Sequence, residues 1–137
     1  MNYFDFDFYI CNFNTTCMTN ECIKSIRQFY NNTIYILDNS NKEKFSTDIS
    51  NVIVIDNYED KLLNITNEIQ TLSSDIAANH NGFASWKHSY SIGWIINHAN
   101  NNFMLMDSDT KLIKNFDDIF NNIDDDIATI CDLEIHN

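Results

Sequence analysis

Basic residues are the scarcest component of this 137-residue chain. The sequence holds 8 Lys and Arg against 20 Asp and Glu, which gives a formal net charge of −12 at pH 7 and a pI of about 4.3. Binding to nucleic acid or to an anionic membrane surface requires clusters of Lys and Arg, so the composition argues against both kinds of partner. An acidic protein can still bind a phosphorylated ligand when a metal ion supplies the positive charge.

The chain also lacks paired cysteines, long apolar runs and proline. Its cysteines, Cys11, Cys17, Cys22 and Cys131, show no C-x-x-C spacing, which disfavours a zinc site and a redox dithiol. We interpret them as reduced thiols, mostly small core residues, and expect a cytoplasmic protein that meets a membrane only through partners. No apolar run approaches the roughly 20 residues of a membrane span, and we interpret the absence of proline as a compositional bias.

The apolar residues, 44% of the chain, are spaced as in alternating strands and helices. Phe6, Phe8 and Ile10 are predicted to share one face of a strand, and residues 22–30 have the three- and four-residue spacing of an amphipathic helix. The predicted strands are 5–11, 33–37, 51–55, 103–106 and 126–135, and the predicted helices are 19–30, 59–69, 82–98 and a short piece within 111–122. This order predicts one α/β domain over residues 1–137, with a Rossmann-like, mainly parallel sheet and flanking helices.

Two of these elements carry more specific predictions. Thr19 is a candidate N-cap for the first helix, with Glu21 placed favourably in the first turn. The uninterrupted apolar run at residues 103–106 predicts an inner strand that is buried on both faces.

Asp107 and Asp109 place two carboxylates directly after that apolar run. Open α/β folds bind ligands at the carboxyl ends of their strands. If the segment stays extended, the two side chains point the same way, and they could hold a divalent cation together with substrate phosphates. The alternative interpretation is an acidic turn that caps the next segment.

Polar clusters follow three of the predicted strands, at residues 12–14, 38–40 and 107–109. In order and spacing they resemble the nucleotide-sugar-dependent glycosyltransferases of family 2, which have the GT-A fold. Asn12-Phe13-Asn14 looks like that family's aromatic-Asn turn, Asp38-Asn39-Ser40 like its second-strand turn, and Asp107-Ser108-Asp109 like its Asp-x-Asp segment. Residues 82–84 and 88–94 resemble the helix that precedes that segment.

This resemblance implies a nucleoside-diphosphate sugar as ligand, most simply a UDP-linked one, and Mn²⁺ or Mg²⁺ as cofactor. It implies that Phe13 and Asn14 lie against the nucleobase and that Asp38 forms a hydrogen bond to it. It further implies that Asp107 lies near the ribose and the metal, and that Asp109 ligates the metal directly. The ion would act as a Lewis acid and as a template for the departing diphosphate.

Lys87 and His88 could add hydrogen-bond donors near the phosphates. For His88 we favour the alternative, an ordinary hydrogen-bonded residue of the predicted helix.

The sequence departs from the family after Asp109. Family members continue into an acceptor-binding half, which carries the base that deprotonates the acceptor hydroxyl, and no such base can be assigned here. The catalytic residues therefore stay unknown. We expect the chain by itself to bind a nucleotide sugar weakly, to transfer no sugar to a glycan or other acceptor, and to self-associate or require a partner chain. It would then be a fragment, a partner-completed protein or a degenerate remnant.

A non-catalytic nucleotide-binding or assembly module derived from a glycosyltransferase is the alternative function. A flavodoxin-like phosphoacceptor domain is disfavoured, because it would cluster acids at the end of the first strand and place a Lys after the last one.

Overall fold

The computed structural model describes residues 5–56 and 80–120. In chain order the elements are β1 (Phe6–Asn12), α1 (Thr16–Arg27), β2 (Ile34–Asp38), β3 (Val52–Asp56), α4 (His80–His98), β4 (Asn102–Asp107) and α5 (Asp117–Phe120). The helix predicted at 59–69 and the strand predicted at 126–135 lie outside the described residues. No helix within the described ranges combines the length and the apolarity that a membrane crossing requires.

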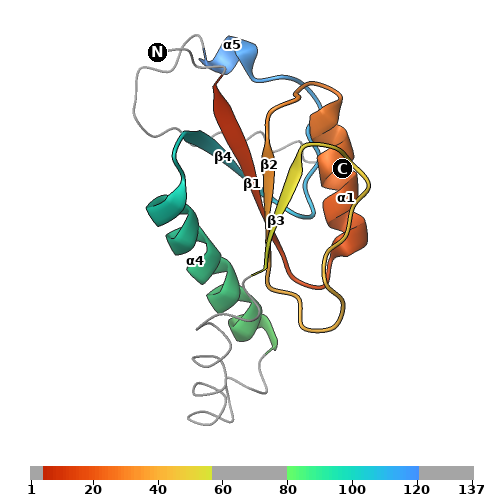
Figure 1. Cartoon of the computed structure of the whole chain (residues 1–137), viewed down its shortest axis with the longest axis vertical. Helices are drawn as coiled ribbons and strands as arrows, with labels where there is room; N and C mark the ends of the chain where they lie inside the picture. Colours follow the sequence, from red (N-terminus) through yellow and green to blue (C-terminus); the bar gives the residue numbers. More distant parts are fainter. Residues whose placement is uncertain (1–4, 57–79, 121–137) are drawn as a thin grey trace, which may run out of the picture.

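The four described strands form one parallel sheet in the order β3-β2-β1-β4. These are the first four positions of the classical doubly wound order, in which the chain moves outward from β1 on one side and then returns to the other. Figure 1 shows α1 on one side of the sheet and α4 on the opposite side. The predicted Rossmann-like α/β fold is therefore confirmed for the described residues.

The first core lies between the sheet and α1. Phe6, Phe8 and Ile10 point into it from β1, as their alternation predicted, and meet Ile23 and Ile26 of α1. The apolar residues of α1 recur every three or four positions, so they share one face of the helix. Its last turn carries Lys24 and Arg27, which interact favourably with the negative end of the helix dipole.

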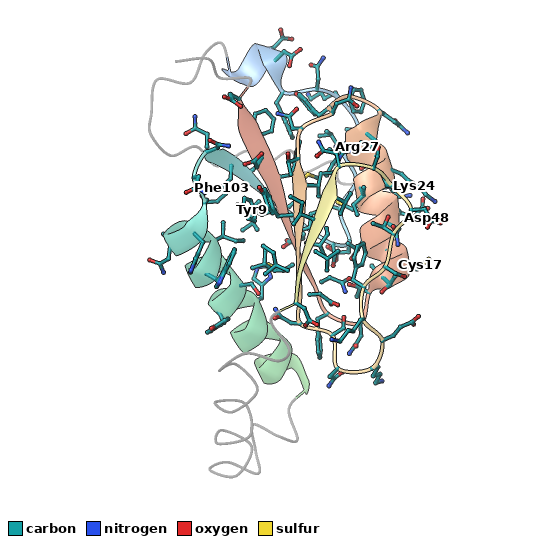
Figure 2. All side chains as sticks on the ribbon, in the orientation of Figure 1. Tyr9, Cys17, Lys24, Arg27, Asp48 and Phe103 are labelled. Carbon is teal, nitrogen blue, oxygen red and sulfur yellow. The ribbon has the colours of Figure 1, made fainter. Side chains whose placement is uncertain are left out.

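The second core lies on the α4 side of the sheet. Tyr9 and Leu37 reach it from β1 and β2, and Ile95 reaches it from α4. The rings of Tyr9 and Phe103 meet edge to face, with 5.7 Å between their centroids, and Figure 2 shows both on the side of the sheet away from α1. Each face of the central strand β1 is thus covered by a different helix.

The predicted start of the first helix is wrong. Thr15, and not Thr19, occupies the N-cap position, α1 begins at Thr16, and its first turn contains no acidic residue. Thr19 is fully buried one turn into the helix, and its hydroxyl donates to Oδ1 of Asn12 at 2.6 Å. Because this contact joins the helix to the end of β1, local sequence preferences do not reveal it.

The prediction that the strand at 103–106 is buried on both faces is also wrong. Within the described sheet, β4 has β1 as its one neighbour and is an edge strand. Phe103 is 40% exposed, and the three residues after it are half-buried. An apolar run indicates a strand, but it does not specify how many neighbours that strand has.

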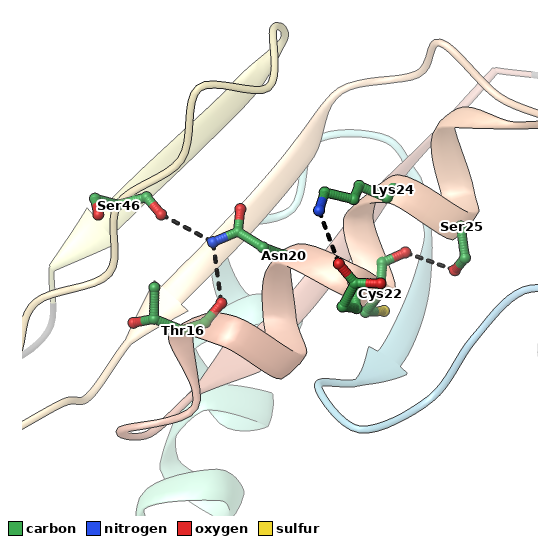
Figure 3. A network of polar contacts seen from close by, with 7 residues as sticks. Thr16, Asn20, Cys22, Lys24, Ser25 and Ser46 are labelled. Carbon is green, nitrogen blue, oxygen red and sulfur yellow. Dashed lines mark hydrogen bonds and ion pairs between the residues drawn. The ribbon is translucent and has the colours of Figure 1, made fainter.

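The segment between β2 and β3 is irregular and is held against α1 by side chains of the helix. Arg27 donates to the backbone carbonyls of Tyr30, Asn32, Ser50 and Asn51 at 2.8–3.2 Å. Asn20 donates to the carbonyls of Thr16 and Ser46, both at 3.0 Å (Figure 3). The bonds to Ser46, Ser50 and Asn51 fix the segment that follows the end of β2 against α1.

The two isoleucines Ile26 and Ile96 offer a matched test of this packing. Ile26 is fully buried in the first core, whereas Ile96 is 66% exposed on α4. We expect Ile26→Ala to lower the free energy of unfolding by about 2–5 kcal/mol, because it leaves a cavity, and Ile96→Ala to change it by less than about 0.5 kcal/mol. Urea denaturation followed by circular dichroism measures both. Equal effects of the two substitutions would contradict this assignment of the core.

Candidate functional site

The order of the strands reverses between β1 and β4. From β1 the chain passes through α1 to β2, whereas α4 leads into β4 on the other side of β1. Open α/β sheets bind ligands at such a switch point, outside the carboxyl ends of the strands. We call the polar residues at or just beyond the carboxyl ends of β1, β2 and β4 the carboxyl rim. Its members are Asn12, Asn14, Thr15, Asp38, Asn39, Ser40, Asp107, Ser108 and Asp109.

The centre of the carboxyl rim is the fully buried side chain of Asn12. Its Nδ2 donates to Oδ1 of Asp38 and to Oγ of Ser40, both at 2.9 Å. Its Oδ1 accepts from the hydroxyls of Thr15, at 3.0 Å, and Thr19, at 2.6 Å. Asn12 therefore joins the ends of β1 and β2 to the first turn of α1 through four hydrogen bonds.

Asp38, predicted to contact the nucleobase, is only 2% exposed. Its Oδ1 accepts from Asn12 and from the backbone N–H of Ser40, and its Oδ2 accepts from the backbone N–H of Phe45 at 2.6 Å. The carboxylate thus folds the loop after β2 back onto the sheet. A direct hydrogen bond from Asp38 to a nucleobase stays a prediction, and holding this loop is an additional role.

Asn14 lies on the surface of the carboxyl rim and adopts a left-handed backbone conformation, with φ of 55°. Asparagine tolerates this region better than most residues. Its Oδ1 accepts from the backbone N–H groups of Asn41 and Lys42, and its own N–H donates to Ser40 Oγ. A cavity of about 380 Å³, lined by residues 14–18, 42 and 43, opens beside it. The neighbouring Phe13 is half-buried.

Asp107 is held by its backbone and presents its side chain to solvent. Its carbonyl accepts from the N–H of Thr110 at 3.1 Å, from the hydroxyl of Thr110 at 2.7 Å, and from the thiol of Cys22 at 3.7 Å. Its side chain is 63% exposed. The register pairs Asp107 with Cys11 of β1, so the exposed carboxylate lies at the switch point itself.

Asp109 is exposed but does not continue the strand. The chain turns at residues 108 and 109, so the extended geometry that would align Asp107 with Asp109 is not present. Thr15 donates to Ser108 Oγ at 3.3 Å and ties this turn to the start of α1. Nowhere in residues 5–56 and 80–120 do three His, Cys, Asp or Glu side chains form a group that could hold a metal ion.

Two residues of α4 contact the carboxyl rim. Ser91 is fully buried and its Oγ accepts from Asn39 Nδ2 at 2.6 Å. His88, one helical turn earlier, places Nε2 3.8 Å from Oδ1 of Asp107. Sequence reasoning missed Ser91 and favoured an ordinary helix role for His88, because both contacts join elements that are far apart in the chain.

One buried and one partly buried thiol, those of Cys22 and Cys11, lie close to these carboxylates. Burial raises the pKa of Cys11 to about 11, and the charge of Asp107 adds to the increase, while a hydrogen bond with Ser91 opposes it. Burial likewise raises the pKa of Cys22 to about 11, and Asp109 and Asp107 contribute. Both thiols are therefore protonated at neutral pH and act as structural groups.

Asn12 can be tested against Asn41, an exposed asparagine that bonds to Asn14. Asn12→Ala removes four hydrogen bonds and leaves buried groups of Asp38 and Thr19 without that partner. We expect it to lower the free energy of unfolding by about 1–3 kcal/mol or more. We expect Asn41→Ala to lower the same free energy by less than about 0.5 kcal/mol. Urea titration of both variants gives the comparison, and a fully stable Asn12→Ala protein would show that the network does not hold the rim.

Thiol alkylation tests the surroundings of the carboxyl rim. Cys17 is exposed, whereas Cys22 is buried and Cys11 largely so, with pKa values of about 11. We expect iodoacetamide at pH 8 to modify Cys17 at least about tenfold faster than the other two, because thiolate fraction and access set the rate. Peptide mapping by mass spectrometry reports each site. Equal rates at the three positions would mean that α1 is not packed as described.

Comparison of the chain with family models, with curated proteins and with solved structures finds no match.

Proposed function

We propose that this chain binds a nucleoside-diphosphate sugar at the carboxyl rim and acts in the cytoplasm as the donor-binding part of a glycosyltransferase. In this proposal the sugar passes to a glycan or another acceptor. The observation that carries the proposal is the exposed carboxylate of Asp107 at the β1/β4 switch point, where open α/β sheets bind their ligands.

Charge balance supports a metal-assisted site. A diphosphate is strongly anionic and the chain carries a net charge of −12, so an added cation is needed to hold the two together. Asp107 and Asp109 are exposed carboxylates, which suit Mg²⁺ or Mn²⁺. Since no larger group of ligands exists within the described residues, phosphate oxygens would complete the coordination. When bound, the ion would stabilise the negative charge on the departing diphosphate.

The loop after β1 provides a place for the nucleoside. Asn14 lines the cavity of about 380 Å³, and its backbone is fixed by hydrogen bonds to the loop after β2. In the proposed complex Phe13 and Asn14 lie against the base. Asp38 either bonds to the base directly or supports it by shaping the loop, and its nearly complete burial favours the second of these roles.

A non-catalytic nucleotide-binding or assembly module is the second candidate. The side chains of Asn12 and Asp38 form their hydrogen bonds with other groups of the protein, which is the arrangement expected of residues with a structural role. This observation favours the module. No described residue is assigned as the base that would activate an acceptor hydroxyl. Transfer from a UDP-linked sugar to pooled glycan acceptors would favour the glycosyltransferase over the module. Binding without transfer is expected of both candidates when the chain is tested by itself.

Asp109→Ala tests the metal-assisted site. We expect the variant to lose at least about tenfold in affinity for UDP in the presence of Mn²⁺, while its unfolding stays unchanged, because the side chain is exposed. Isothermal titration calorimetry with and without Mn²⁺ measures the effect. Asp118→Ala is the matched control, since Asp118 is exposed on α5, which Figure 1 shows at the far end of the molecule from the loop after β1. Unchanged Mn²⁺-dependent affinity in Asp109→Ala would remove Asp109 from the site.

A further inference from the structure

Two potential metal ligands, His88 and Asp107, approach each other at the switch point. Nε2 of His88 lies 3.8 Å from Oδ1 of Asp107, and the two side chains are 39% and 63% exposed. The residues come from different elements, α4 and β4, and they are 19 positions apart in the chain. This contact joins α4 to the acidic end of β4.

The position of His88 is set by the packing of α4. Ser91 accepts a hydrogen bond from Asn39 at the end of β2, and Ile95 packs in the second core. Residues 88, 91 and 95 follow one another at three- and four-residue steps, so they share one face of the helix. The contacts of Ser91 and Ile95 therefore direct His88 toward the carboxyl rim.

We propose that His88 is a nitrogen ligand to the metal ion that Asp107 binds, and that it makes the site selective for first-row transition ions over Mg²⁺. This inference rests on the proposed function for the identity of the diphosphate ligand. The pairing of His88 with Asp107 does not depend on the proposed function, because both residues belong to this chain.

The separation of the two atoms is that of an ion pair, and it also fits two ligands of one shared ion. At 3.8 Å, Nε2 and Oδ1 are too far apart for a hydrogen bond. Two ligands that each lie about 2.0–2.2 Å from one ion are about 3–4 Å apart, depending on the angle between them. A small change in either exposed side chain would therefore let both reach the same ion.

The chemistry of the pair determines which ion is preferred. Imidazole suits transition ions, whereas Mg²⁺ prefers carboxylate, carbonyl and water oxygens. Affinities at a mixed nitrogen and oxygen site rise from Mn²⁺ to Co²⁺ and higher. The pair therefore predicts that Co²⁺ and Mn²⁺ bind more tightly than Mg²⁺, and that the difference becomes smaller when the imidazole is removed.

The experiment compares His88→Gln with His98→Gln in the full chain. His98 is an exposed histidine on the same helix that stacks on Trp94, with 4.2 Å between ring centroids, and it serves as the matched control. Calorimetry measures Co²⁺, Mn²⁺ and Mg²⁺ binding, each without and with UDP, and the visible absorption of Co²⁺ reports nitrogen ligation. We expect His88→Gln to lower Co²⁺ affinity at least about tenfold, to leave Mg²⁺ affinity nearly unchanged and to alter the Co²⁺ spectrum, whereas His98→Gln matches the parent.

The measurements without UDP and with UDP test the inference and the proposed function separately. Metal binding that depends on His88 in the absence of UDP supports the inference, even if UDP fails to bind and the proposed function falls. UDP binding with metal that is indifferent to His88→Gln overturns the inference and leaves the proposed function standing. A uniform loss of affinity for all three ions, or no Co²⁺ binding in either arm, also overturns it. Circular dichroism confirms that each variant is folded.

Discussion

The shape of the carboxyl rim depends on one buried amide. Asn12 donates to Asp38 and Ser40 and accepts from Thr15 and Thr19, so a single side chain connects two strand ends and a helix. A buried polar network in which each member has its partners specifies one arrangement, whereas the loss of one member leaves several others unsatisfied. The loops that reach the surface are anchored to this network, so its integrity sets the geometry of anything they bind.

The acidic residues of the rim divide into two kinds. Asp38 is buried, and its carboxylate is used to fold the loop after β2, so its contribution to a ligand site is mainly through shape. Asp107 and Asp109 are exposed, and their carboxylates are available to a ligand or an ion. The sequence places all three at strand ends but does not distinguish these roles, because burial is decided by which side chains the fold brings around each one.

Local patterns predicted most of the described elements, and non-local contacts account for the errors. The alternation in β1 and the apolar spacing in α4 predicted both elements, since each depends on residues close in sequence. Thr19 was misassigned because its hydroxyl bonds to Asn12, seven residues away. The edge position of β4 within the described sheet depends on the order of the strands. The approach of His88 to Asp107 depends on the crossing of α4 over the sheet, which residue spacing does not encode.

The scarcity of cations constrains how the rim can hold a phosphate. Arg27, the chain's one arginine, is committed to backbone carbonyls, and Lys24 and Lys44 are paired with Glu21 and Asp56. These groups hold the loops and helix in place and lie apart from the end of β4. A diphosphate at the switch point would meet the exposed carboxylates of Asp107 and Asp109 there. A metal ion that enters with such a ligand would offset the charge of these carboxylates, so the groups that choose that ion would also affect the strength of binding.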